Sequence, residues 1–169
     1  MNVRLACVDD LNEIMELYHL VSDMMEDSAY DIGWRKDVYP TKEIVLLDIE
    51  QQTLYVLEKN EKIIGAIVLN HEYEECYNKL SWQIFADDDE VLILHRLCIH
   101  PQYRGCGKFL IKQAIEIAKF LNQKAIRLDV LCTNKPAIYL YEKCGFLLQG
   151  YQTMDYGEPV VAGLYERLI

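Results

Sequence analysis

Long hydrophobic runs are missing from this sequence. No apolar stretch reaches the roughly 18 to 20 residues that a membrane-spanning helix needs, and residues 1–4 do not begin a signal-peptide pattern. We therefore expect a soluble, cytoplasmic protein that does not interact with a membrane.

Basic side chains are scarce. The chain has 17 Lys and Arg residues against 27 Asp and Glu residues, which gives a formal net charge of −10. This charge repels the phosphates of a nucleic acid and no basic stripe offsets it, so we expect no nucleic-acid partner. An acidic surface could instead attract a cationic amine.

Clustered cysteines are absent as well. The six cysteines, at positions 7, 76, 98, 106, 132 and 144, form no C-x-x-C pair and no ligand-like group with the four histidines. This spacing argues against a zinc site and against a disulfide framework. We expect reduced thiols and no bound metal.

What remains is a chain of 169 residues that is 51% hydrophobic, which is enough to bury one core. No linker, repeat or low-complexity tract divides it, so we expect a single domain over residues 1–169. Helical and alternating apolar spacings predict an α+β (mixed α/β) fold, with a final turn at Gly157-Glu158-Pro159. The expected strands are 2–7, 53–58, 62–70, 91–100, 125–131, 148–156 and 160–168, and the expected helices are 10–25, 41–50, 105–121 and 135–143.

A glycine-containing loop follows the apolar run Val91–Ile99. Residues 102–107 read Gln-Tyr-Arg-Gly-Cys-Gly, and an amphipathic run begins at Lys108. Glycine lets the backbone turn tightly and approach a ligand, and the first N–H groups of a new helix point at an anion. Glycine also closes ordinary strand-to-helix turns, so the loop alone favours a phosphate site only weakly.

A second pattern, Asn-x-x-Ala-x-x-x-Tyr-x-x-x-Gly-Phe, runs from Asn134 to Phe146. Together with the loop, which matches Gln/Arg-x-x-Gly-x-Gly/Ala, it resembles the GNAT family of acyl-CoA-dependent N-acyltransferases. The resemblance rests on motifs from Leu94 to Phe146 and on element order elsewhere. It implies the GNAT fold, a mostly antiparallel sheet flanked by helices in the order β-αα-ββ-β-α-β-α-ββ.

The resemblance also implies acetyl-CoA as the co-substrate. In the GNAT fold the strands ending at residues 100 and 132 part, and the pantetheine amides pair with the exposed edge. The pyrophosphate is expected on the loop, mainly at backbone N–H groups. Asn134, besides capping a helix, is expected to bond the pantetheine arm. The implied cofactor-binding residues are Leu97, Cys98, Ile99, Gln102, Tyr103, Arg104, Gly105, Cys106, Gly107, Lys108, Asn134, Ala137, Tyr141 and Lys143.

Tyr141 is the expected general acid. It stands seven residues after Asn134 and four before Gly145, where the family pattern has its tyrosine. A phenol within hydrogen-bond reach can protonate the thiolate that leaves when an amine attacks the thioester. Without the motif, a tyrosine on a half-buried helix would indicate packing alone.

The general base is less well defined. Some family members have a carboxylate on the strand before the loop, and the matching position here is Ile93. His95 shares the strand parity of Ile93 and Leu97, so it is the expected base or water-orienting residue. The alternatives, at the end of the preceding strand, are Glu72, Glu74 and Glu75.

Acceptor contacts are expected between the first two helices, where Tyr30, Trp34 and Tyr39 cluster. Aromatic side chains there can cage a cation or an apolar group, and they can equally anchor the segment to the core. The pattern does not distinguish a small-molecule amine from a peptide amine.

The leading interpretation is an N-acetyltransferase that moves an acetyl group from acetyl-CoA to a primary amine by direct attack. A non-catalytic acyl-CoA sensor is the alternative, kept open by the missing carboxylate at Ile93. A cysteine nucleophile, Cys98 or Cys106 with His95 or His100, is a second alternative, although no orienting third group is evident. A homodimer through the edge of the last two strands is one arrangement that the sequence allows.

Overall fold

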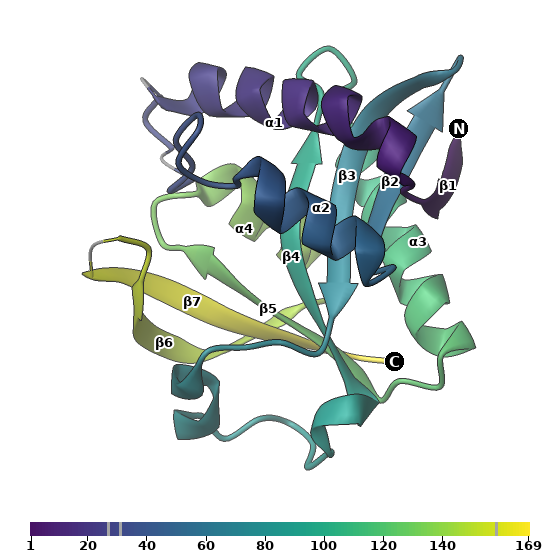
Figure 1. The fold of residues 1–169 in the computed structure, drawn as a ribbon. Coiled ribbons are helices and arrows are strands. Elements are labelled where there is room, and N and C mark those ends of the chain that lie inside the picture. The colour runs from purple at the N-terminus through teal and green to yellow at the C-terminus, as the bar shows by residue number, and fades with distance from the viewer. Residues whose placement is uncertain (27, 31, 158) are drawn as a thin grey trace.

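The computed structural model describes residues 1–26, 28–30, 32–157 and 159–169. Its strands form one seven-stranded sheet in the order β1-β2-β3-β4-β5-β7-β6 (Figure 1). The strands are β1 Asn2–Leu5, β2 Leu54–Lys59, β3 Lys62–Asn70, β4 Val91–Ile99, β5 Ala125–Leu131, β6 Leu147–Asp155 and β7 Pro159–Leu168. The helices are α1 Leu11–Glu26, α2 Lys42–Glu50, α3 Cys106–Phe120 and α4 Lys135–Lys143, with short 3-10 segments η1 Val8–Asp10, η2 Glu75–Lys79 and η3 Asp88–Glu90.

The predicted order of helices and strands is confirmed. Every pair of neighbouring strands is antiparallel except β4 and β5, which run parallel. The strand at the N-terminus is shorter than predicted, because η1 begins at Val8. Of the turn predicted at residues 157–159, Glu158 lies outside the described residues.

The sheet has a helical layer on each face, as Figure 1 shows. On one face α1 contributes Leu11, Ile14 and Tyr18, which recur at helical spacing and are buried with residues of β2 and β3. On the other face α3 contributes Leu110 and Ile111 to a second cluster, with residues of β4, β5 and α4. None of the helices formed by the described residues has the length and apolarity that crossing a bilayer requires.

The two middle strands stay together over a short distance only. Strand β4 pairs with β5 at three positions, from Val91 opposite Ala125 to Ile93 opposite Arg127. Beyond them β5 continues beside β7 as far as Leu131. The edge of β4 from residue 94 onward therefore has no partner strand on the β5 side, and a gap in the sheet opens toward the start of α3.

A β-bulge interrupts β4 inside this unpaired part. Ala66 lies opposite Cys98 and Val68 opposite His95, so Ile67 faces two residues of β4. Arg96, the extra residue, has a φ of 48°, which is a left-handed value that is uncommon outside glycine. The bulge shifts the alternation of side chains along the strand.

The predicted parity of His95 with Leu97 is therefore wrong. Ile93, on the N-terminal side of the bulge, is buried in a cluster with Tyr77, whereas Leu97 packs against the cluster that holds α3. The regular alternation of side chains along a strand is broken here, because one extra residue moves all later side chains to the opposite face. The position of His95 is therefore taken from its contacts in the structure and not from strand alternation.

Candidate active site

A cavity of about 870 Å³ occupies the place where β4 and β5 part. One end is lined by Leu97, Ile99 and α4, and the other by the segments before α2, after β3 and after β6. A volume of this size is typical of a site for a small molecule. The cavity therefore extends from the unpaired edge of β4 to a region enclosed by three loops.

The predicted cofactor strand lines this cavity. Leu97, Cys98 and Ile99 all contribute to its wall. Their backbone groups on the β5 side have no strand partner, because the β4–β5 pairing ends at Ile93. An extended ligand with amide groups can pair with such an edge as an added strand.

The glycines of the loop serve two different purposes. Gly105 has a φ of 85°, and a Cβ added there would meet no atom within 4 Å. Gly107 is inside α3, where an added Cβ would lie 2.9 Å from Cδ2 of Leu140. The first glycine thus allows the turn and leaves open space at the helix start, whereas the second lets α4 approach α3.

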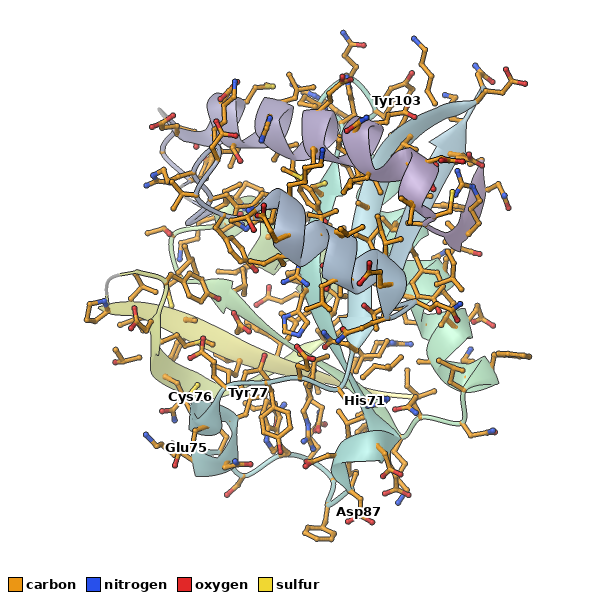
Figure 2. The ribbon with its side chains drawn as sticks, viewed as in Figure 1. His71, Glu75, Cys76, Tyr77, Asp87 and Tyr103 are labelled. Atoms are coloured by element: carbon orange, nitrogen blue, oxygen red, sulfur yellow. The ribbon has the colours of Figure 1, made fainter. Side chains whose placement is uncertain are left out.

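Tyr103 fixes the loop to the rest of the fold. Its ring packs against the α3 cluster and lies edge-on to His100, and Lys59 Nζ lies 5.1 Å from its centroid. Figure 2 shows Tyr103 at the top of the molecule, far from Tyr77. The side chains of the loop and helix start that remain open to solvent are Gln102, Arg104 and Lys108.

Asn134 begins α4 beside the cavity. Its side-chain oxygen accepts a hydrogen bond from the backbone N–H of Ala137 at 3.2 Å, and both residues line the cavity. The oxygen thus caps the helix, and the amide NH₂ remains as a donor for a ligand. Lys143 lies in the last turn of the same helix, with Nζ 5.3 Å from the ring centroid of Tyr139, at the end remote from Asn134.

Tyr141 reaches the cavity from α4. Its side chain is 6% exposed and lies edge-on to Phe146, with 5.7 Å between ring centroids. Burial raises the pKa of Tyr141 well above its usual value near 10, and the charge of Asp129 adds to the shift. Within the described part of the chain, no hydrogen bond engages its hydroxyl. The residue therefore presents a protonated phenol in the cavity.

His95 also lines the cavity. Its Nε2 lies 2.9 Å from the backbone oxygen of Glu72. A carbonyl can only accept, so Nε2 carries the proton and Nδ1 keeps its lone pair. Burial lowers the pKa of His95, which leaves the imidazole neutral at pH 7. A neutral imidazole with a free lone pair can accept a proton.

Asp129 is the cavity residue that sequence reasoning missed. It lies on β5, and its carboxylate accepts hydrogen bonds from the hydroxyls of Tyr77 and Tyr156. Its charge raises the pKa of both Tyr141 and His95, and all three residues line the same cavity. The available signal was a carboxylate within the buried strand Ala125–Leu131, because charged residues are rarely buried unless they are paired.

Further carboxylates surround the same end of the cavity. Glu72, Glu74 and Asp155 line it together with Asp129. Desolvation raises the pKa of Glu74, and the charges of Asp129 and Asp155 add to the effect. Glu75, the third predicted alternative, is not among the described residues that line the cavity and lies on η2 at the lower left of Figure 2.

The structure places two of the three predicted aromatic residues in the cavity wall. Trp34 and Tyr39 line the acidic end of the cavity, and the Trp34 ring lies edge-on to Tyr18. Tyr30 is 43% exposed and is not in the lining formed by the described residues. Tyr156, which the sequence did not single out, lines the cavity and packs beside Gly33.

The structure disfavours Cys98 as the nucleophile of the cysteine alternative. Cys98 is 5% exposed and packs among residues of α1, β2 and β3. Burial raises the pKa of its thiol to about 12, so the nucleophilic thiolate is disfavoured. Nδ1 of His100 lies 3.3 Å from the backbone nitrogen of Gln102, from which it can accept a hydrogen bond. The cleft instead combines an open strand edge, a glycine loop at a helix start and a buried phenol.

A model of the acetyltransferase (GNAT) family matches residues 10–146. The chain belongs to the GNAT family. An uncharacterized N-acetyltransferase of Methanocaldococcus jannaschii is 29% identical over 152 residues, which are 85% of this chain and 59% of the relative. The chain thus spans less than two thirds of the length of that relative. A Bacillus subtilis protein named as a candidate ribosomal protein bS18 alanine N-acetyltransferase is 27% identical, over 95% of this chain and 89% of the relative.

Solved acetyltransferase structures share the fold. A GNAT-family acetyltransferase of Streptococcus agalactiae superposes with a TM-score of 0.85 at 21% identity, covering 99% of this chain and 95% of that one. A candidate acetyltransferase of Salmonella typhimurium, solved with its cofactor acetyl-CoA, gives a TM-score of 0.71 at 17% identity, covering 99% and 93%. The predicted GNAT fold is confirmed.

Proposed function

We propose that the protein is an acetyl-CoA-dependent N-acetyltransferase that acts on a primary amine by direct attack. The observation that carries the proposal is the unpaired edge of β4. It leads to the glycine loop at the start of α3 and shares one cavity with the Tyr141 hydroxyl. Membership of the GNAT family supports the same activity.

The residues of this cleft suit acetyl-CoA. The open space at Gly105 lies next to the first turn of α3, whose N–H groups lack intrahelical acceptors. The loop is therefore a fitting site for the pyrophosphate, with Arg104 and Lys108 adding positive charge. The backbone of Leu97, Cys98 and Ile99 and the amide of Asn134 suit the pantetheine arm. When bound, acetyl-CoA supplies an activated acetyl thioester.

Tyr141 is the proposed general acid. Its raised pKa keeps the phenol protonated across the physiological range, and its hydroxyl is open to the cavity. It can therefore donate a proton to a leaving sulfur atom without first losing it to solvent. The ring is held by burial against Phe146, so the hydroxyl is positioned by packing.

His95 is the proposed group that takes the proton of the acceptor, and Asp129 is the proposed group that supports it. An alkylammonium has a pKa near 10.4, so it must lose a proton before it can attack. The neutral imidazole of His95 can accept that proton directly or through a water molecule. Asp129 is held in place by Tyr77 and Tyr156, and its charge stabilises the imidazolium that results.

The acceptor end favours a positively charged amine. Four carboxylates line it, whereas its basic residue Arg96 is already paired with Asp48. An ammonium approaching this chamber gains from the negative field, and the rings of Trp34 and Tyr39 can pack against its carbon chain. The acceptor is therefore a cationic amine of a small molecule or of a peptide.

The direct test is release of CoA thiol from acetyl-CoA in the presence of a panel of amines, with the product identified by mass spectrometry. The panel should contain a diamine, a monoamine of the same chain length, an amino acid and a peptide with a free N-terminus. We expect N-acetylated product, with the diamine favoured over the amino acid. Binding of acetyl-CoA without turnover on every member would support the sensor alternative instead.

A further inference from the structure

Arg96 links the strand that faces the cofactor to the segment that faces the acceptor. It is the extra residue of the β4 bulge and comes directly before Leu97. Its side chain leaves the strand toward α2 and the segment before it, which lie across β4 in Figure 1. One residue therefore touches both halves of the cleft.

The guanidinium of Arg96 is held by two partners. Its Nη2 lies 2.7 Å from each carboxylate oxygen of Asp48 on α2. Its Nη1 donates to the Tyr39 hydroxyl at 3.0 Å. The side chains of Arg96 and Asp48 are only 11% and 6% exposed, so solvent screens the pair weakly. The fork of the guanidinium fixes orientation as well as distance.

The backbone of the bulge is held from α1. The hydroxyl of Tyr18 donates to the carbonyl oxygen of Arg96 at 3.2 Å. The ring of Tyr18 in turn lies edge-on to Trp34, with 5.3 Å between centroids. Trp34 and Tyr39 are the aromatic residues of the acceptor end, so both walls of that end are connected to the same bulged residue.

We propose that the ion pair of Arg96 and Asp48 is a positioning pair. It fixes the place of the acceptor wall, formed by Trp34 and Tyr39, relative to the strand edge formed by Leu97, Cys98 and Ile99. This inference rests on the proposed function, because it assigns that edge to acetyl-CoA. The left-handed backbone at Arg96 sets the direction of the strand edge that follows it. The contacts with Asp48 and Tyr39 maintain that backbone conformation. A change at either partner is transmitted to both ligand sites.

A second buried ion pair supplies a matched control. Arg127 and Glu166 lie 2.9 Å apart and are 12% and 0% exposed, yet neither lines the large cavity. Asp48→Asn and Glu166→Gln each remove one negative charge from a buried pair with little change in shape. A purely structural role predicts the same behaviour for both variants, namely lower thermal stability with unchanged ligand affinity in the folded protein.

The experiment is calorimetric titration of both variants and the unmodified protein with acetyl-CoA, together with the KM for the best amine of the panel. We expect Asp48→Asn to weaken acetyl-CoA binding and to raise the amine KM, each by about tenfold, as for an ordinary coupling between sites. Glu166→Gln should keep both values within about twofold of the unmodified protein, as expected for a site without such coupling. Equal ligand affinities in Asp48→Asn and the unmodified protein would overturn the inference.

Tyr39→Phe covers the case in which Asp48→Asn does not fold. It removes only the hydroxyl that accepts from Arg96 and keeps the ring in the cavity wall. We expect it to weaken acetyl-CoA binding measurably, although Tyr39 lies on the acceptor side. Unchanged acetyl-CoA affinity in a folded Tyr39→Phe variant would contradict the proposal. Failure of the unmodified protein to bind acetyl-CoA would instead contradict the proposed function.

Discussion

Replacing Tyr141 with phenylalanine should separate catalysis from folding. The substitution removes one hydroxyl and leaves the buried ring, with its edge-on contact to Phe146, in place. No described residue makes a hydrogen bond to that hydroxyl, so its removal breaks none within the described part of the chain. We expect a stability change within about 1 kcal/mol, which corresponds to about 2–4 °C in Tm for a domain of this size.

The expected effect on the rate is larger. General acid catalysis contributes about 10²- to 10⁴-fold, and each factor of ten is about 1.36 kcal/mol of barrier. Loss of the hydroxyl should therefore raise the barrier by about 3 to 5 kcal/mol, well beyond its effect on stability. The affinity for acetyl-CoA should stay close to that of the unmodified protein, because the ring still lines the cavity.

The assay measures kcat from release of CoA thiol, affinity by calorimetry and Tm by scanning fluorimetry. Tyr139→Phe is the matched control, since this tyrosine is on the same helix but 63% exposed and outside the cavity lining. It should keep its kcat. The reasoning would be refuted if Tyr141→Phe turned over at nearly the unmodified rate, or if its Tm fell by much more than about 4 °C.

Three other predictions address the base, the loop and the thiols. Burial lowers the pKa of His95, so kcat/KM should fall only as the pH drops below about 6.5, where the imidazole becomes protonated. His95→Gln should remove this acid limb, and an unchanged limb would contradict His95 as the base. Gly107→Ala would place a Cβ 2.9 Å from Cδ2 of Leu140, the end of a flexible side chain that can shift. Chemical denaturation should therefore show a loss of unfolding free energy within about 1 kcal/mol, and a loss well above about 3 kcal/mol would contradict a contact limited to the side-chain end. The pKa of Cys98 is raised to about 12, so in the folded protein at pH 8 its thiol should resist iodoacetamide, whereas the exposed Cys7 should react. Rapid alkylation of Cys98, detected by mass spectrometry, would contradict its burial.

The fold was predictable because its signals are local. Helix α1 repeats apolar residues at helical spacing, and Asn134 with Ala137 forms a cap that can be recognised in the sequence. The loop and the Asn134–Phe146 pattern are likewise continuous in the chain. Local periodicity and contiguous motifs therefore predicted the element order and several residues that line one end of the cleft.

The acidic end of the cavity was harder to predict because its contacts are distant in sequence. The bulge at Arg96 is stabilised by Asp48 and Tyr39, which are 48 and 57 residues away, and nothing near Arg96 signals its left-handed backbone. The parity of His95 was misread for that reason. Asp129 owes its place to Tyr77, at a separation of 52 residues. Such pairings become visible only in the folded chain.

The central claim is that the cleft between β4 and β5 binds acetyl-CoA with its pyrophosphate at the glycine loop. Calorimetric titration of the unmodified protein, Gly105→Ala and Gly157→Ala tests it most directly. Both glycines have positive φ, of 85° and 91°, and neither would place a Cβ within 4 Å of another atom, so both substitutions impose a similar backbone strain. Gly157 lines the acidic end of the cavity and is not part of the glycine loop. The account predicts binding that weakens about tenfold in Gly105→Ala and persists in Gly157→Ala. No binding by the unmodified protein, or equal affinity in all three, would contradict it.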